Sequence, residues 1–156
     1  MGPDHVNRRQ FVCAGAAMLV IGSAQAGAAA ALSITVYKDP SCGCCTAWVE
    51  HLKSAGFKTK VEERSDMGEL KARLGVPDAL ASCHTGIVNG YVIEGHVPAD
   101  DIKRLVALRS KAKGLAVPGM PVNSPGMEVP GAANERYTVW LFRADGKRSA
   151  FAKHGG

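Results

Sequence analysis

The sequence has no internal repeat and no basic segment interleaved with aromatic residues. Aromatic residues make up only 6% of the chain, and its 19 Lys and Arg residues are spread among 14 Asp and Glu residues, for a net charge of +5. Nucleic-acid-binding domains usually gather positive charge on one face or in one run. We therefore expect no nucleic-acid partner, and the charges indicate an ordinary solvated surface.

Large aliphatic residues are few in the long uncharged segment at residues 11–32, which is rich in Ala and Gly. That composition makes a poor membrane span. A charged head with Arg8 and Arg9, a short apolar core and an A-x-A site ending at Ala26 instead predict a secretory signal peptide over residues 1–26. The arginine pair also fits a twin-arginine export signal. We expect export to the periplasm, cleavage near Ala26 and no stable membrane insertion afterwards, with an uncleaved anchor as the alternative.

The rest of the chain, residues 33–156, is long enough for one domain with its own core. Asp66 is expected to cap a helix, and Asn89-Gly90 is a strong signal for a hairpin turn. Apolar periodicity predicts a strand at 33–39, a helix at 45–56, a strand at 57–64, a helix at 67–75, a hairpin at 85–95 and a helix at 100–109. This order predicts an α/β, thioredoxin-like layered domain with the first cysteines at its first strand-to-helix turn.

Residues 111–134 are rich in Pro and Gly and interrupt the pattern. The segment also holds apolar residues, including Met120 and Met127, that are poorly suited to exposure in a free linker. We expect an ordered loop that folds back over the cysteine turn as a lid. A final hairpin is expected at 137–154, with Asp145-Gly146 as its turn.

Four cysteines lie in the expected exported chain: Cys42, Cys44, Cys45 and Cys83. An even number in an oxidising compartment usually indicates disulfides. However, the adjacent Cys44 and Cys45 point in different directions, so only one of them can join Cys42 without strain. A redox pair of Cys42 and Cys45 at a helix N-terminus is a second interpretation. It leaves Cys44 unexplained, because a third thiol there would scramble the disulfide.

Four soft donors also suit a metal ion. Zinc is the commonest structural choice, but four-cysteine zinc sites usually take two ligands from each of two turns. Crowded thiolates that bridge several ions favour Cu(I), and the thioethers of Met120 and Met127 favour it weakly as well. Both methionines are therefore candidate ligands, and the choice between copper, zinc and thiol–disulfide exchange stays open from the residues alone.

Three separated segments stand out: YKDPSCGCCTAWVEHL, ASCHTGIVNGYVIEGHVPADDI and GLAVPGMPVNSPGME. Together they resemble the motifs of the CopG-like family of periplasmic copper-resistance proteins, long catalogued as a domain of unknown function. The similarity covers about residues 34–130. The final hairpin lies outside these motifs.

The resemblance implies a thioredoxin-like domain that holds a cysteine-bridged, multinuclear Cu(I) cluster and contributes to copper tolerance. Its implied ligands are Cys42, Cys44, Cys45 and Cys83. Interconversion of Cu(I) and Cu(II) has been proposed for this family, so the resemblance leaves open whether the protein is a copper oxidoreductase or, as we expect, a metal-binding protein. Copper ions and other periplasmic copper-handling proteins are the expected partners. The alternatives are a thiol–disulfide oxidoreductase and a module stabilised by zinc or disulfides.

The histidines divide into one candidate ligand and several structural residues. His84 directly follows Cys83, and imidazole suits copper, so His84 is a further candidate metal ligand. His51 lies two helical turns beyond Cys44, too far for a shared ion. His96 is interpreted as a packed, hydrogen-bonded loop residue before a helix rather than as a ligand.

Overall fold

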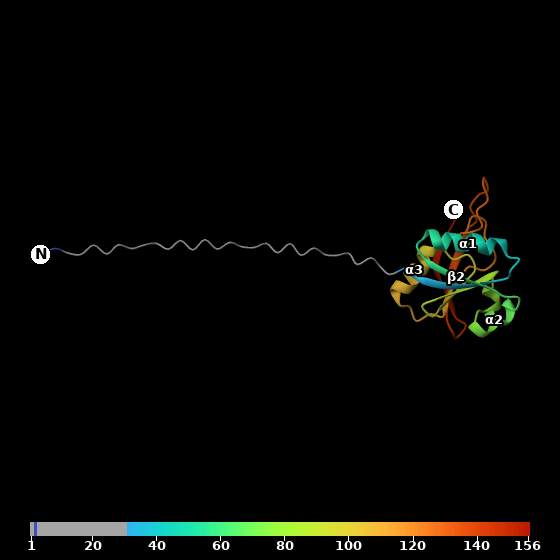
Figure 1. Ribbon diagram of the computed structural model, residues 1–156, viewed down its shortest axis with the longest axis horizontal. Helices are drawn as coiled ribbons and strands as arrows, with labels where there is room; N and C mark the ends of the chain where they lie inside the picture. Colours follow the sequence, from blue (N-terminus) through green and yellow to red (C-terminus); the bar gives the residue numbers. More distant parts are fainter. Residues whose placement is uncertain (1, 3–30) are drawn as a thin grey trace.

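The computed structural model describes Gly2 and residues 31–156 (Figure 1). The predicted signal peptide therefore lies, apart from Gly2, outside the described residues. Within the described part, no helix is long and apolar enough to cross a membrane. The elements are β1 (Ser33–Lys38), α1 (Gly43–Ser54), β2 (Lys58–Glu63), α2 (Met67–Leu74), the 3-10 helix η1 (Asp78–Leu80), β3 (His84–Val88), β4 (Tyr91–Glu94), α3 (Ala99–Leu108), β5 (Gly114–Ala116), β6 (Tyr137–Phe142) and β7 (Arg148–His154).

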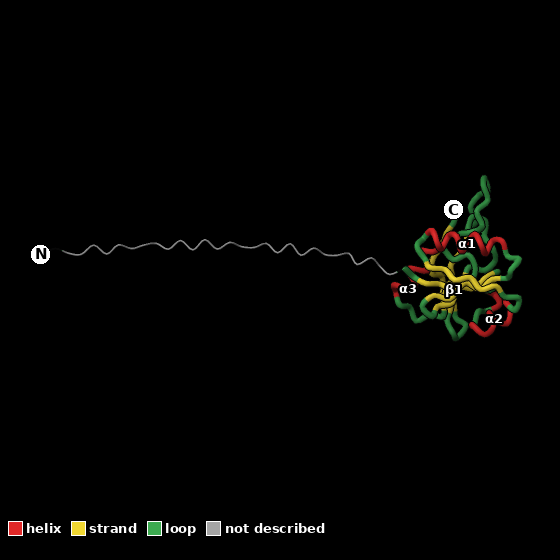
Figure 2. Tube along the Cα trace, in the orientation of Figure 1, coloured by secondary structure: helices red, strands yellow, loops and turns green. Residues whose placement is uncertain are grey.

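The described strands form one mixed seven-stranded sheet in the order β2-β1-β3-β4-β5-β6-β7. The β1–β2 and β4–β5 pairs are parallel, and the other neighbours are antiparallel. In Figure 2 the strands lie between α1 on one side and α2 on the other. The fold class is therefore α/β, as the sequence pattern predicted.

The core lies on both faces of this sheet because successive strand residues point to opposite sides. Leu115 belongs to the larger cluster, which includes residues of α1 and α3, whereas the next residue, Ala116, belongs to the smaller cluster beside η1. The helix residues buried in the larger cluster are Trp48, Val49, Leu52, Ala99, Ile102 and Leu105. The burial of Trp48, at 0% exposure, fits its expected core position.

The predicted hairpin turn at Asn89-Gly90 was confirmed, whereas the predicted side-chain cap at Asp66 was wrong. Asn89 and Gly90 both have positive φ and join β3 to β4, with Val88 paired to Tyr91. Asp66 precedes α2, but its side chain makes no capping hydrogen bond. Its carboxylate instead accepts two hydrogen bonds of 2.6 Å from Arg64, which lower the pKa of Asp66 to about 2. A two-point, charge-assisted bond is stronger than a single bond to a backbone N–H.

The predicted loop at 111–134 contains a strand that the sequence pattern missed. The three residues of β5 pair in parallel with β4 and antiparallel with β6, which joins the terminal hairpin to the main sheet. Gly114 permits this close approach, since a Cβ there would lie 1.7 Å from the Val92 carbonyl oxygen. Three residues are too few to show a clear period-2 pattern.

The rest of the Pro/Gly-rich segment is held by turns and packs on α1. Asn123 organises it: its amide Nδ2 donates to the carbonyl oxygen of Ala132, and its Oδ1 accepts from the Val129 N–H. Gly126 lies so close to α1 that a Cβ would be 2.6 Å from the Trp48 backbone nitrogen. The segment therefore covers part of the first helix.

Replacing Gly126 with Ala should destabilise the protein more than the matched change Gly131→Ala. Both glycines have positive φ, but no atom lies within 4 Å of a Cβ at Gly131. The left-handed backbone alone costs about 1–2 kcal/mol for alanine, and the clash at Trp48 should add about 1–3 kcal/mol. Urea unfolding of both variants measures the difference. Equal losses would show that the loop does not press on α1.

Candidate metal centre

The turn between β1 and α1 presents three cysteines at the start of a helix. The Cys42 N–H donates to the Asp39 carbonyl oxygen at 3.0 Å, and the Ser41 N–H donates to the Asp39 carboxylate at 2.9 Å. The Ser41 hydroxyl donates to the same carboxylate, and these two bonds from Ser41 lower the pKa of Asp39. Cys42 is the residue before the helix, so Cys44 and Cys45 lie in its first turn. The fourth cysteine, Cys83, comes from the residue before β3.

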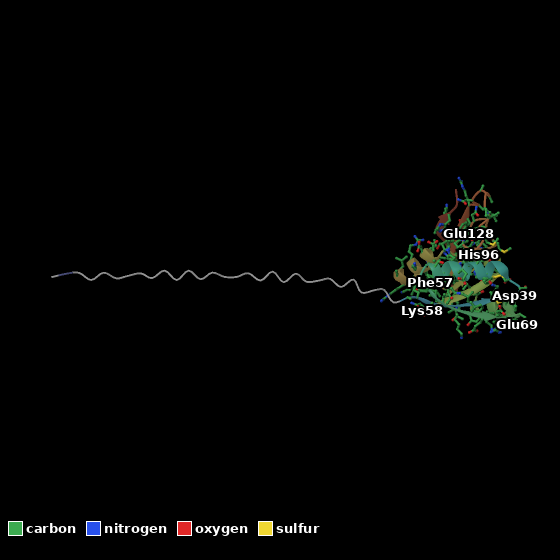
Figure 3. All side chains as sticks on the ribbon, turned by 45° about the horizontal axis from the view of Figure 1, so that its top comes forward. Asp39, Phe57, Lys58, Glu69, His96 and Glu128 are labelled. Atoms are coloured by element: carbon green, nitrogen blue, oxygen red, sulfur yellow. A yellow bond between two sulfur atoms is a disulfide. The ribbon has the colours of Figure 1, made fainter. Side chains whose placement is uncertain are left out.

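The four sulfur atoms of Cys42, Cys44, Cys45 and Cys83, here called the sulfur cluster, lie within 4.8 Å of one another. Cys44 Sγ is central: it is 3.5 Å from Cys42 Sγ and 3.8 Å from Cys83 Sγ. Figure 3 shows yellow sulfur atoms at the end of the domain where Asp39 is labelled, opposite Phe57 and Lys58. The structure thus brings together all four cysteines that the sequence singled out.

Two of these cysteines are oxidised in the structure. Cys42 and Cys45 form a disulfide, while Cys44 and Cys83 are free thiols. The cysteine count alone favoured two disulfides, but the described residues form one. Burial, together with the neighbouring Cys44 thiol, raises the pKa of Cys83 to about 11. A metal ion that binds Cys83 must therefore displace a proton at neutral pH.

Two buried histidines extend the site on the side of Cys83. The His84 Nδ1 and His96 Nε2 atoms each lie 3.3 Å from Cys83 Sγ. The two rings meet edge to face, with centroids 4.9 Å apart, and His84 also packs against Trp48. Burial lowers the pKa of both histidines, to about 3 for His84, so both rings are neutral at physiological pH. Neutral imidazole is the form that binds metals.

The tautomer of His96 follows from its neighbours. Its Nδ1 lies 2.8 Å from the Pro125 carbonyl oxygen, which can only accept a hydrogen bond. Nδ1 therefore carries the proton, and Nε2 directs a lone pair towards Cys83. In Figure 3, His96 lies near Glu128 of the Pro/Gly-rich segment, residues 111–134. On His84, Nε2 is buried with no hydrogen-bond partner among the described residues.

His96 was expected to be a structural loop residue, but its Nε2 lies beside Cys83. A usable signal was present. With Asn89-Gly90 as a two-residue turn, Val88 pairs with Tyr91, and continuing this register to the open end of the hairpin sets Cys83 opposite His96. The predicted hairpin was therefore enough to place His96 beside Cys83.

The two candidate methionines have different positions. Met120 Sδ lies 3.9 Å from Cys44 Sγ, and the side chain is 52% exposed. Met127 makes backbone hydrogen bonds within the loop, and its thioether accepts no hydrogen bond from the described cysteines. His51 is also separate from the cluster, because its Nε2 accepts the Ala99 N–H at the start of α3.

The sheet and the cysteine turn define an α/β protein with a sulfur-rich site flanked by neutral histidines, a donor set of metal-binding character. The family model that matches residues 80–127 is described as a protein of unknown function, DUF411. Two solved structures are similar over most of the chain: copper resistance protein CopG in form 1 and in form 2. Each is 45% identical with a TM-score of 0.76; form 1 covers 81% of this chain and 99% of its own, and form 2 covers 80% and 98%.

No curated protein gives a significant match. The identity to the two solved structures nevertheless extends over nearly their whole length. The chain belongs to the CopG-like family of copper-resistance proteins, as the three sequence motifs predicted.

Acidification should destabilise the metal-free protein. The pKa values of His51, His84 and His96 are lowered in the folded chain from an ordinary value of 6.5, mainly by burial. The unfolded chain then binds more protons, so the free energy of unfolding falls as the pH drops below about 6.5. His51→Gln should remove part of this dependence, because glutamine does not titrate. Urea unfolding between pH 7.5 and 5 tests this, and an unchanged slope in His51→Gln would contradict it.

Proposed function

We propose that this protein is an exported copper-binding protein that contributes to copper tolerance by holding several copper ions on the sulfur cluster. One observation carries the proposal: the four cysteine sulfur atoms lie within 4.8 Å of one another. The relatives named copper resistance protein CopG support the choice of metal. Removal of residues 1–26 during export to the periplasm belongs to the same proposal, and N-terminal sequencing of the exported chain tests it.

We further propose that the scaffold is thioredoxin-like. The first four sheet positions, β2-β1-β3-β4, combine a parallel β1–β2 pair with antiparallel β3 and β4. Helices α1 and α3 contribute to the core on one face, and η1 contributes on the other. The strands β5, β6 and β7 then extend this unit at its β4 edge. The cysteine turn lies at the N-terminus of α1, where the helix dipole favours thiolates.

The donor set favours Cu(I) over zinc. Adjacent thiolates that share one turn can bridge ions, whereas a single zinc ion requires four ligands arranged tetrahedrally around it. Met120 adds a thioether beside Cys44, and the neutral His84 and His96 add nitrogen donors beside Cys83. We propose His84, His96 and Met120 as additional ligands, and Met127 as a loop residue.

The disulfide provides a route for copper redox handling. Oxidation of the Cys42 and Cys45 thiolates forms one S–S bond and releases two electrons, which reduce two Cu(II) ions to Cu(I). In the opposite direction, two Cu(I) ions supply the two electrons that return the disulfide to thiolates. Only the reduced form offers all four cysteines as ligands, so the form with the Cys42–Cys45 disulfide should bind less copper.

Thiol–disulfide exchange is the second candidate, and the Cys42–Cys45 disulfide at the start of α1 is the observation in its favour. Against it, the free thiol of Cys44 lies 3.5 Å from Cys42 Sγ, close enough to attack the disulfide within the same turn. An oxidoreductase acting on other proteins would lose selectivity through this internal exchange.

Cys44→Ser should lower copper loading by more than one donor's share, because a bridging sulfur serves more than one ion. The measurement is copper, zinc and free thiols per chain after anaerobic reduction and loading with Cu(I). Cys42→Ser and Cys83→Ser should behave alike if the four cysteines act as one unit. Full copper loading of Cys44→Ser would overturn the cluster. Disulfide-exchange activity that survives in Cys44→Ser but is lost in Cys42→Ser would favour the second candidate.

Met120→Leu should weaken Cu(I) binding, whereas Met127→Leu should leave it close to wild type. Both changes keep an apolar side chain of similar volume and remove only a sulfur atom, so each is the control for the other. Competition with a chromophoric Cu(I) chelator measures the affinities. Equal behaviour of the two variants would show that the Met120 thioether is not a ligand.

A further inference from the structure

Ser82 forms hydrogen bonds that connect Glu94 of β4 with the segments that carry Cys83 and Met120. Its backbone N–H donates to Glu94 Oε1 at 2.7 Å, and its hydroxyl donates to the Gly119 carbonyl oxygen at 2.7 Å. The residues that follow these contacts in the chain are Cys83 on one side and Met120 on the other. One serine thus links the segment that carries Cys83 to the segment that carries Met120.

The anchor of Ser82 is a buried charged group. Glu94 is fully buried, and its carboxylate is surrounded by donors: Lys71 Nζ and the Ser82 N–H on Oε1, and the Thr85 hydroxyl on Oε2 at 2.6 Å. Lys71 also donates to the Thr85 hydroxyl oxygen at 2.9 Å. Removing any one donor would leave buried charge poorly compensated, so this arrangement tolerates little movement. The backbone of Ser82 is fixed as a consequence.

Met120 lacks a comparable anchor of its own. Its side chain is 52% exposed, so burial contributes little to its position. The preceding Gly119 is exposed as well, so burial does not hold that residue either. The segment is tied to β4 at Val117, whose N–H donates to the Glu94 carbonyl oxygen at 2.9 Å. Between Val117 and Met120, the Ser82 hydroxyl is the described contact that ties the loop to the site.

We propose that Ser82 is a positioning residue that holds the Met120 thioether beside Cys44, with buried Glu94 as its anchor. The inference rests on the proposed copper function. The hydroxyl has one proton and two acceptors in reach: the Gly119 carbonyl oxygen at 2.7 Å and Cys83 Sγ at 3.9 Å. The shorter contact to oxygen takes the proton, which leaves Cys83 Sγ free of this donor.

The test is a double-mutant cycle on Cu(I) affinity, measured in the reduced protein by competition with a chromophoric Cu(I) chelator. Ser82→Ala should weaken binding about 5-fold, the value of one hydrogen bond. In a Met120→Leu background the same change should have almost no further effect, because Ser82 acts through Met120. Tyr91→Phe is the matched control, since it removes a hydroxyl-to-carbonyl bond, Tyr91 to Ser110, at the hairpin-turn end of β4.

The Thr and Val variants at Ser82 form a second, shape-matched pair. Ser82→Thr keeps the hydroxyl and should retain wild-type affinity, whereas Ser82→Val should weaken Cu(I) binding as Ser82→Ala does. This pair decides the question if Ser82→Ala does not fold. The NMR signal of the Met120 ε-methyl group in the metal-free protein gives a readout that needs no copper: it should shift in Ser82→Ala and Ser82→Val but not in Tyr91→Phe.

The outcomes separate the two proposals. Wild-type protein that binds no Cu(I) overturns the proposed function and this inference together. Wild-type protein that binds Cu(I) normally, with Ser82→Ala and Ser82→Val unchanged, overturns the positioning role alone. An equal effect of Ser82→Ala with and without Met120 also overturns it, because Ser82 would then act on Cys83 rather than on Met120.

Discussion

The antiparallel pairing of β1 with β3 is the constraint on which the site depends. It places Lys38, the last residue of β1, opposite His84, the first residue of β3. The cysteine turn that follows β1 therefore meets Cys83, which precedes β3, although Cys44 and Cys83 are 39 positions apart. A shift of this register by one residue would exchange the faces of β3 and separate the sulfur atoms.

Further strand pairs add the remaining donors in the same way. The β3–β4 hairpin brings His96 to Cys83, and the parallel β4–β5 pair directs the following loop back over the site, where Met120 reaches Cys44. Strand pairing in the sheet thus brings site residues from four separate segments together. Each pair contributes to stability as well as to geometry, so the site is assembled by the same contacts that fold the domain.

The buried charged side chains around the site each have a partner of opposite charge. Lys38 is 6% exposed, forms an ion pair with Glu63 and donates to the Asp39 carbonyl oxygen, which supports the turn before Cys42. Glu94 is enclosed with Lys71 behind Cys83. The histidines are kept neutral by burial, so they present lone pairs rather than positive charge. A site with these properties favours soft cations without a net buried charge.

The sequence by itself determined the four cysteines, the α/β class and the Asn89-Gly90 turn, because these follow from residue type, short-range periodicity and turn chemistry. The sequence did not show which of two local partners Asp66 would bind: its carboxylate pairs with Arg64 rather than capping α2. Only the tertiary structure decided that β5 completes the sheet, that Met120 rather than Met127 reaches Cys44, and that His96 faces Cys83. These outcomes depend on strand register and loop closure, and such long-range pairings are set by the packed core as a whole rather than by the residues next to them in the chain.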